Sequence, residues 1–299
     1  MKFLFSIISF AAICYGGYYF WQNHPDFRSA ASDFVSRQVK TSDVQTLEIR
    51  YSAEQLMEKH KTSLLKNKKY AFLEPQLKLH PYLLLEVKYS RNNKTTSEGL
   101  ILWSLLNGEM VLDTLSWEMT HGYEDCLNAK VSKAEFLILN ALARSGGVMD
   151  KKSLISMLKT NSSTLMNLIR SCVRKKLIVE TLQTYRLHFE HPKLTQHPAT
   201  NVEQWLVTKT TKQDITAPKK YSSYQIKQLA ENAFGQDFAI RKMTEVFLPV
   251  YTIAVQNPDS SIYTTYFNAV SGSQMSENLS FEVEEQHNSV IEDIKSILN

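Results

Sequence analysis

The chain has 299 residues, of which 43% are hydrophobic and 21% are charged. This length allows two or three domains, and this composition excludes a chain that is disordered throughout. The net charge of +4 is too small to indicate a nucleic-acid-binding protein by itself. Its distribution says more, because residues 151–176 carry seven Lys or Arg and no acid, whereas residues 276–299 carry six acids and one Lys.

The three cysteines predict neither disulfide bonds nor a metal site. They are odd in number, and no two of them have the spacing of metal ligands. Their distribution fits a reducing compartment. They are Cys14, Cys126 and Cys172.

Residues 1–22 are predicted to be a membrane anchor. The 19 residues from Phe3 to Trp21 carry no charge, which is enough for a helix to cross a hydrocarbon core of ~30 Å. Aromatic residues crowd the C-terminal end of this run, as at a membrane interface. A cleaved signal peptide is the alternative, although no cleavage site with small residues precedes the aromatic cluster.

Basic residues lie on both sides of the predicted anchor, so the positive-inside rule leaves its orientation open. Lys2 favours a cytoplasmic N-terminus. A cytoplasmic position for the rest of the chain is favoured by Arg28, Arg37 and Lys40. We expect a single-pass protein of the cell membrane whose soluble part lies in the cytoplasm.

Two segments, residues 45–115 and 221–276, are each predicted to fold as a helix followed by three strands. Both have a strand led by a proline, then a polar turn, then an aromatic-containing strand closed by a glycine turn. Two unrelated α+β folds are the alternative interpretation. The predicted helices are Ser52–Lys66 and Ser223–Phe234, and the predicted strands are Tyr70–Leu79, Tyr82–Tyr89, Leu100–Leu105, Phe238–Phe247, Tyr251–Gln256 and Ile262–Phe267.

The second of these segments resembles PepSY-like modules. The resemblance is carried by the closing sequence Phe267-Asn268-Ala269-Val270-Ser271-Gly272 and covers about fifty residues. Between the winged-helix region described next and this segment, residues 193–220 are predicted to be a linker with one short buried piece around Trp205-Leu206-Val207. Residues 277–299 are predicted to be an acidic tail that ends in a helix, Asn288–Leu298.

Residues 130–192 show the clearest pattern, three helices followed by a hairpin. Ser132 begins the first helix, which ends at a pair of glycines, and Asp150 begins the second. This order is that of a winged helix-turn-helix. The predicted elements are a helix Lys133–Arg144, a second helix that Asp150 caps and that runs through Leu158, a third helix that starts at Asn161 or Ser162 and ends at Lys176, and the strands Leu177–Thr181 and Arg186–Phe189.

This region is similar to the MarR-like winged-helix group. The similarity rests on the glycine turn after the first helix, the Ser/Thr-rich start of the third, and the sequence Arg174-Lys175-Lys176-Leu177-Ile178 that leads into the wing. Proteins of that group dimerise and bind DNA, so the resemblance implies a possible homodimer and DNA as a partner.

One face of the predicted third helix carries a polar stripe suited to the major groove. Arg170 and Arg174 are expected to reach guanine or phosphate, and Asn167 to reach adenine. Phosphate contacts are expected from Lys151, Lys152, Lys159, Lys175, Lys176 and Arg186. The complete stripe is Ser163, Asn167, Arg170, Ser171 and Arg174.

Two other interpretations of this face remain open. A basic stripe is often only a solvated surface, and winged helices also bind proteins. The predicted wing tip, Leu182–Tyr185, has no basic residue, and Met166 at the start of the third helix suits a protein contact as well as a base.

No catalytic sequence pattern such as GxGxxG, HExxH or GxSxG occurs, so we expect neither an enzyme nor a cofactor or metal site. The sequence therefore predicts an α+β protein with an N-terminal transmembrane helix and a winged-helix domain between two small α-β-β-β modules. The predicted function is that of a membrane-anchored DNA-binding regulator. The alternative is a membrane-anchored scaffold or assembly factor whose winged helix binds protein.

Overall fold

The computed structural model describes residues 41–66, 69–91, 95–158, 161–189, 191–194, 197–203, 206–212 and 215–275. Within these ranges the protein is a mixed α+β chain with one ten-stranded and one three-stranded sheet. The predicted anchor and the predicted acidic tail lie outside the described residues. None of the helices in these ranges is long and apolar enough to span a membrane.

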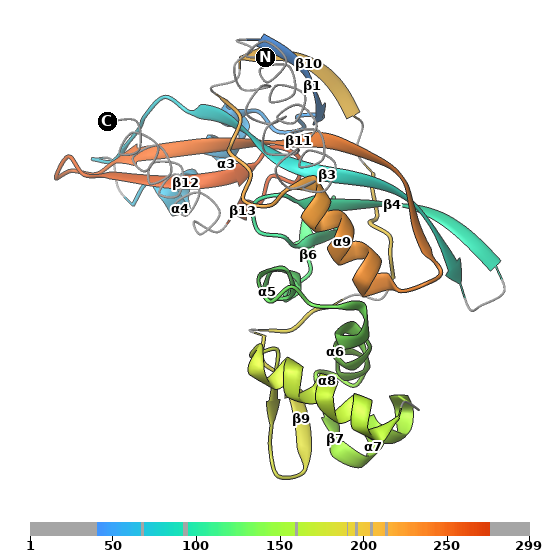
Figure 1. Cartoon of the computed structure of the whole chain (residues 1–299). Helices are drawn as coiled ribbons and strands as arrows, with labels where there is room; N and C mark the ends of the chain where they lie inside the picture. Colours follow the sequence, from blue (N-terminus) through green and yellow to red (C-terminus); the bar gives the residue numbers. More distant parts are fainter. Residues whose placement is uncertain are drawn as a thin grey trace, which may run out of the picture.

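Two long antiparallel strands, β3 (Gln76–Arg91) and β11 (Phe238–Gln256), form the centre of the large sheet. The two segments predicted as separate modules therefore share one sheet (Figure 1). Its order is β10-β1-β11-β3-β4-β5-β6, with β12 and β2 also paired to β11 and β13 paired to β12. The other strands are β1 (Thr41–Leu47), β2 (Ala71–Phe72), β4 (Thr95–Ser104), β5 (Met110–Asp113), β6 (Glu118–Met119), β10 (Leu206–Lys212), β12 (Ile262–Asn268) and β13 (Gln274–Met275).

The predicted breaks before Tyr82 and Tyr251 are wrong, because both long strands continue through their prolines. The carbonyl of Pro81 accepts a hydrogen bond from the Leu105 N–H at 3.1 Å, so this residue faces the β4 side of β3. The regular β3–β4 pairing ends at the next residue, Tyr82. Pro81 has no backbone N–H to donate, but it lies just beyond the end of the β3–β4 ladder. A strand tolerates a proline at such a position. Pro249 is placed in the same way relative to β12.

The two halves of the sheet repeat each other about the pair His80–Leu248. In the first half, the Leu105 carbonyl accepts the N–H groups of Lys220 and Tyr221 at 3.0 and 2.9 Å. The ring of Tyr221 lies against Gly108, which has a φ of +66°. These contacts connect the β4–β5 turn of the first half to the chain just before the helix of the second.

The turn of the second half makes the same contacts with the chain just before the helix of the first half. The Ala269 carbonyl accepts the N–H groups of Arg50 and Tyr51, both at 2.9 Å. The ring of Tyr51 lies against Gly272, which has a φ of +70°. The two halves are thus related by an approximate twofold axis, and each contributes its leading helix to the other.

Matching capping boxes begin the two exchanged helices, α3 (Ala53–Lys59) and α9 (Ser223–Phe234). Ser52 and Gln55 cap α3, and Ser222 and Gln225 cap α9. Leu56 of α3 packs with residues of β11 and β12, while α9 packs into the main core beside β3 and β4. A short helix, α4 (Lys61–Leu64), follows α3.

The helical unit, residues 130–189, lies on one side of the sheet (Figure 1). Helix α5 (Tyr123–Asn128) precedes it in the chain. Its apolar side chains belong to the same core as those beneath α9. The helix boundaries predicted for this region are confirmed to within two residues. The elements are α6 (Lys133–Arg144), β7 (Val148–Asp150), α7 (Lys151–Leu158), α8 (Ser162–Arg174), β8 (Ile178–Glu180) and β9 (Thr184–Leu187), with sheet order β7-β9-β8.

The segment predicted as a linker, residues 193–220, contributes one strand to the large sheet, and Leu206 of the predicted buried piece is 42% exposed there. Strand β10 pairs with β1 along seven residues. Single bridges join Lys193 to His121, Asn201 to Asp113, and Thr216 to Leu79. The threonines that suggested a polar linker are β-branched and also favour strands, which explains the difference.

Candidate nucleic-acid interface

Helix α8 is held in place by a local cap and an apolar face. The side chain of Asn161 accepts a hydrogen bond from the Ser163 N–H at 3.1 Å. The inward side chains Leu165, Ile169 and Cys172 are at most 1% exposed and belong to the main core. This packing fixes which side of the helix faces solvent.

Four of the predicted stripe residues are exposed on the outer side of α8: Ser163, Asn167, Arg170 and Arg174. Lys176, just beyond the helix, is exposed as well and has a positive φ of 57°. Its N–H donates to the Val173 carbonyl at 3.0 Å, so it ends the helix in the left-handed conformation common there. Across the described part of the chain, neither arginine pairs with a carboxylate.

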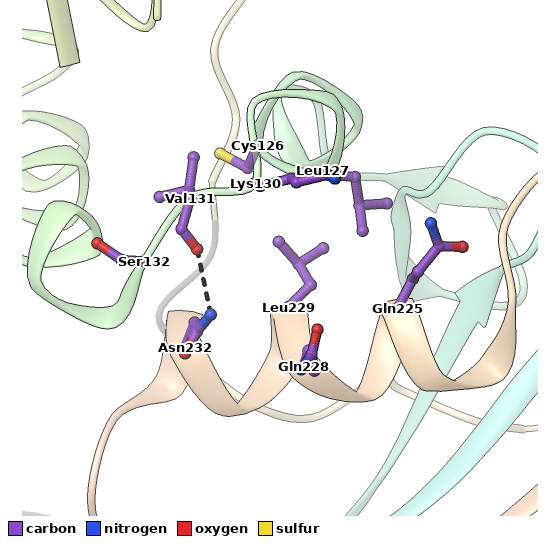
Figure 2. A pocket seen from close by; sticks show the side chains of 9 residues that line it. All are labelled: Cys126, Leu127, Lys130, Val131, Ser132, Gln225, Gln228, Leu229 and Asn232. Atoms are coloured by element: carbon purple, nitrogen blue, oxygen red, sulfur yellow. Dashed lines mark hydrogen bonds between the residues drawn. The ribbon is translucent and has the colours of Figure 1, made fainter. Parts of the chain in front are cut away.

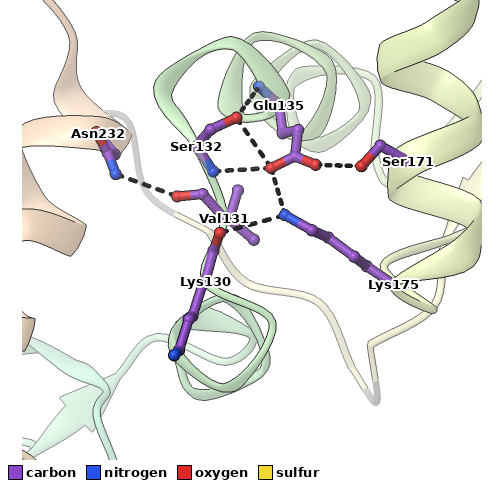
Figure 3. A network of polar contacts seen from close by, with 7 residues as sticks. All are labelled: Lys130, Val131, Ser132, Glu135, Ser171, Lys175 and Asn232. Carbon is purple, nitrogen blue, oxygen red and sulfur yellow. Dashed lines mark hydrogen bonds and ion pairs between the residues drawn. The ribbon is translucent and has the colours of Figure 1, made fainter.

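The remaining stripe residue, Ser171, and the neighbouring Lys175 point inward instead (Figure 3). The Ser171 hydroxyl donates to Glu135 Oε1 at 2.7 Å, and Lys175 Nζ lies 2.7 Å from Glu135 Oε2. Lys175 also donates to the Lys130 carbonyl at 3.2 Å. Both side chains bind Glu135 of α6, and Lys175 also binds the Lys130 carbonyl just before that helix. The prediction that Ser171 and Lys175 contact DNA is corrected for this reason.

Glu135 is the centre of this network although it is only 3% exposed. Its Oε2 also accepts from the N–H and the hydroxyl of Ser132 at 2.8 and 2.9 Å. Burial by itself would raise the pKa of Glu135, but hydrogen bonds from Lys175, Ser132 and Ser171 lower it to about 2. The carboxylate is therefore ionised and joins α6 to α8.

Of the residues outside α8 that were predicted to contact phosphate, one pairs with an acid of the hairpin and two are exposed. Lys151 Nζ lies 2.6 Å from Glu180 Oε1 and 5.3 Å from the centre of the Tyr185 ring, so this lysine binds the β8–β9 hairpin. Lys152 and Arg186 are exposed. Lys159 lies outside the described residues.

The tip of the β8–β9 hairpin is apolar and polar rather than basic. Leu182 is 97% exposed there. Thr181 closes the tip, since its N–H donates to the Thr184 carbonyl at 2.9 Å. Met166, which was predicted to be exposed at the start of the third helix, is half-buried and packs against the main core.

A groove of about 280 Å³ separates α9 from α5 and the turn that leads to α6 (Figure 2). Polar groups tie its two sides together, since Asn232 Nδ2 donates to the Val131 carbonyl at 3.1 Å and Asn140 Nδ2 to the Ala233 carbonyl at 3.0 Å. The groove therefore marks the junction between the helical unit and the sheet. It is lined by Cys126, Leu127, Lys130, Val131, Ser132, Gln225, Gln228, Leu229 and Asn232.

A second buried carboxylate, Glu109, supports the same junction from the sheet side. It is 6% exposed and accepts hydrogen bonds from the Thr120 hydroxyl at 2.6 Å and from the N–H groups of Gly122 and Glu124 at 2.8 and 3.0 Å. These donors lie at the start of α5, so Glu109 caps that helix from the β4–β5 turn.

Sequence reasoning missed both buried carboxylates. A signal for Glu135 was present, because Ser132 and Glu135 have the spacing of a capping box. Nothing in the sequence near Glu109 indicates its partners, which follow it by more than ten positions.

Comparisons with protein families, with curated proteins and with solved structures find no match to this chain.

Proposed function

We propose that residues 130–192 form a winged helix-turn-helix that binds DNA through the outer face of α8. The observation that carries this proposal is the exposed row Ser163, Asn167, Arg170 and Arg174, whose arginines have no acidic partner in the described part of the chain. Arginine can make two hydrogen bonds to guanine and can also contact phosphates. Asparagine can make two hydrogen bonds to adenine. Lys152, Lys176 and Arg186 extend the basic surface to either side.

The charge of this unit supports the same proposal. Residues 130–192 contain eleven Lys or Arg and four Asp or Glu, a net charge of +7, whereas the whole chain carries +4. The rest of the protein is therefore acidic in sum. A basic unit on an otherwise acidic chain directs a polyanion to that unit.

Binding to a fluorescently labelled random-sequence duplex at 50 mM salt tests the proposal. Changing both Arg170 and Arg174 to Ala is expected to weaken binding on every sequence in the pool, because a cation that contacts phosphate contributes to affinity whatever the base. Arg241→Ala is the matched control, because Arg241 is an exposed arginine on the sheet that pairs with Glu98 at 2.9 Å. Equal affinity of both variants would contradict the proposal.

A protein-binding role is the second candidate, and the wing tip favours it. Leu182 is almost fully exposed at a position where a DNA-binding wing places a basic residue. Further exposed apolar side chains on this unit are Leu137, Val148, Ile155 and Met157. Leu182→Asp would abolish capture of a protein partner and leave DNA affinity within a factor of about two, the size expected for a change remote from the contacts.

The proposed unit would be tethered to the cell membrane by residues 1–22 and would act in the cytoplasm as a membrane-anchored regulator. The support for this part is the uncharged run of 19 residues in the sequence. A reporter fused after Asn299 tests it. Cytoplasmic activity of the reporter is expected, and an exterior reporter would contradict DNA binding, because no chromosome lies there.

A further inference from the structure

The buried carboxylate of Glu109 lies where the sheet meets the helical unit. It belongs to the β4–β5 turn, while two of its donors, the N–H groups of Gly122 and Glu124, lie at the start of α5. Helix α5 lies between the sheet and the helical unit (Figure 1). One hydrogen-bonded carboxyl group therefore joins the turn of the sheet to the helix that precedes the unit.

The C-terminal end of α5 is connected to the helical unit in its turn. The Cys126 carbonyl accepts the Val131 N–H at 3.0 Å. The Lys130 carbonyl accepts a hydrogen bond at 3.2 Å from Lys175 Nζ, at the end of α8. A displacement of α5 would therefore act on contacts that reach both the approach to α6 and the end of α8.

The equivalent position in the second half of the sheet is a serine. The Ser104 N–H donates to the Glu109 carbonyl at 2.9 Å, and the Asn268 N–H donates to the Ser273 carbonyl at 3.0 Å. The hydroxyl of Ser273 shares a hydrogen bond of 2.6 Å with that of Ser271. At this position of the repeat, the buried acid thus occurs in the half from which the helical unit extends.

The hydrogen bonds around Glu109 accommodate both the ionised and the protonated carboxyl group. Thr120 Oγ1 lies 2.6 Å from Glu109 Oε2, accepts the Met110 N–H at 2.8 Å and lies 3.3 Å from the Met110 carbonyl. When Glu109 is ionised, the Thr120 hydroxyl donates to it. When Glu109 is protonated, its own O–H donates to Thr120, whose hydrogen turns to the Met110 carbonyl. The proton is therefore gained or lost with the rotation of one hydroxyl.

Burial and a neighbouring charge oppose the ionised form. Glu109 is 6% exposed, and burial raises its pKa from 4.5 to about 7 against these hydrogen bonds, with a smaller contribution from the carboxylate of Glu124. Glu124 is itself bound by Lys220 and by the Tyr221 hydroxyl. The other titratable side chains of α5 and its approach are Tyr123 and Cys126, which are buried, and His121 and Asp125, which are exposed.

We propose that Glu109 is a pH-sensitive contact between the sheet and the helical unit. The protonated carboxyl group holds the start of α5, and loss of its proton to solvent favours a state in which α5 has moved away and the carboxylate is hydrated. The unit stays attached to α9 through Asn140 and Asn232, so the junction loosens on one side only. The proposal is independent of DNA binding, because it concerns the junction and not the outer face of α8.

Amide hydrogen exchange of the full chain between pH 5 and 7.5 tests this proposal. The protection factors of the Gly122 and Glu124 N–H groups, which are corrected for intrinsic exchange, should fall by roughly tenfold to a hundredfold, because opening of α5 releases a proton. They should level off above about pH 7. At pH 7.5 both groups should be at least about tenfold less protected than the amides of β3, since local opening precedes global unfolding.

Two variants assign the pH dependence to one group. Glu109→Gln copies the protonated form, so the protection of α5 should no longer change with pH. His121→Gln is the matched control, because it removes a neighbouring side chain of a type that titrates near neutral pH. It should leave the decline as it is in the unchanged chain.

Infrared difference spectra detect the proton itself. The carbonyl stretch of a protonated carboxyl group should disappear as the pH rises through 7 in the unchanged chain, and this change should be missing from Glu109→Gln. The proposal is overturned if that signal does not depend on Glu109, or if the protection of α5 is constant with pH in the unchanged chain. It is also overturned if the decline survives Glu109→Gln, if it is lost in His121→Gln, or if α5 is as well protected as β3 at pH 7.5.

Discussion

Lys175 Nζ lies 2.7 Å from Glu135 Oε2, and this ion pair joins the end of α8 to the start of α6. The sequence predicts that this lysine contacts DNA, because it follows the polar stripe directly. Its actual partner is a carboxylate that is 3% exposed. The pair therefore anchors the end of the helix that carries Arg170 and Arg174.

Lys175→Met should lower the free energy of unfolding by about 1–3 kcal/mol, because the buried carboxylate loses its cation and one hydrogen bond. The adjacent Lys176→Met is the control, since Lys176 is exposed and its change should stay within about 0.5 kcal/mol. Urea unfolding of the two variants compares them. Equal stabilities would show that the pair does not join α6 to α8.

Glu109 should make the protein less stable as the pH rises. Burial raises its pKa from 4.5 to about 7, against the hydrogen bonds from Glu124, Thr120 and Gly122. Because the folded state favours the protonated form, this contribution to stability is full below about pH 4.5 and is lost as the pH rises through 7. Glu109→Gln stays neutral, so it should remove a decline of about 3 kcal/mol between pH 4.5 and 8 in urea unfolding. An unchanged pH profile in this variant would contradict the assignment.

His80 should act in the opposite direction. It is 3% exposed at the centre of the repeat, and burial, with a smaller effect of Lys78, lowers its pKa from 6.5 to about 4. The folded state favours the neutral ring, so its contribution is present above pH 6.5 and is lost as the pH falls toward 4. His80→Leu, which copies the equivalent Leu248, should remove up to about 3 kcal/mol of acid destabilisation. The result against this account is equal acid sensitivity of variant and unchanged chain.

Gly272→Ala should destabilise the protein more than Gly146→Ala, although both residues have a φ near +70°. An added Cβ at Gly272 would lie 3.0 Å from the Tyr51 ring, whereas at Gly146 it would meet nothing within 4 Å. The backbone strain of about 1 kcal/mol is common to both, so the difference measures the contact with Tyr51. Similar melting temperatures for the two variants would show that this contact contributes little.

Local structure could be predicted from the sequence where a cap and a periodic apolar face agree. Ser132, Asp150 and Ser222 each begin a helix, and the three helices of the basic unit lie where their patterns placed them. The likeness of the segments led by Pro81 and Pro249 was also readable, because strand, turn and glycine recur in the same order.

Long-range pairing could not be predicted in the same way. The register that sets Tyr82 against Val246 depends on both halves at once, and no local pattern reports it. The prolines suggested interruptions because a local rule cannot know that the ladder ends beside them. Ser171 and Lys175 illustrate the same limit within the candidate interface, since a helical wheel shows a polar face but does not show a buried acid opposite it.

The central claim is that Arg170 and Arg174 contact DNA, and the salt dependence of binding by the full chain tests it most directly. The logarithm of the binding constant should fall linearly with the logarithm of salt concentration. Where both arginines contact phosphate, changing both to Ala should reduce that slope by about two. An identical slope and affinity for the double variant and the Arg241→Ala control would contradict the claim.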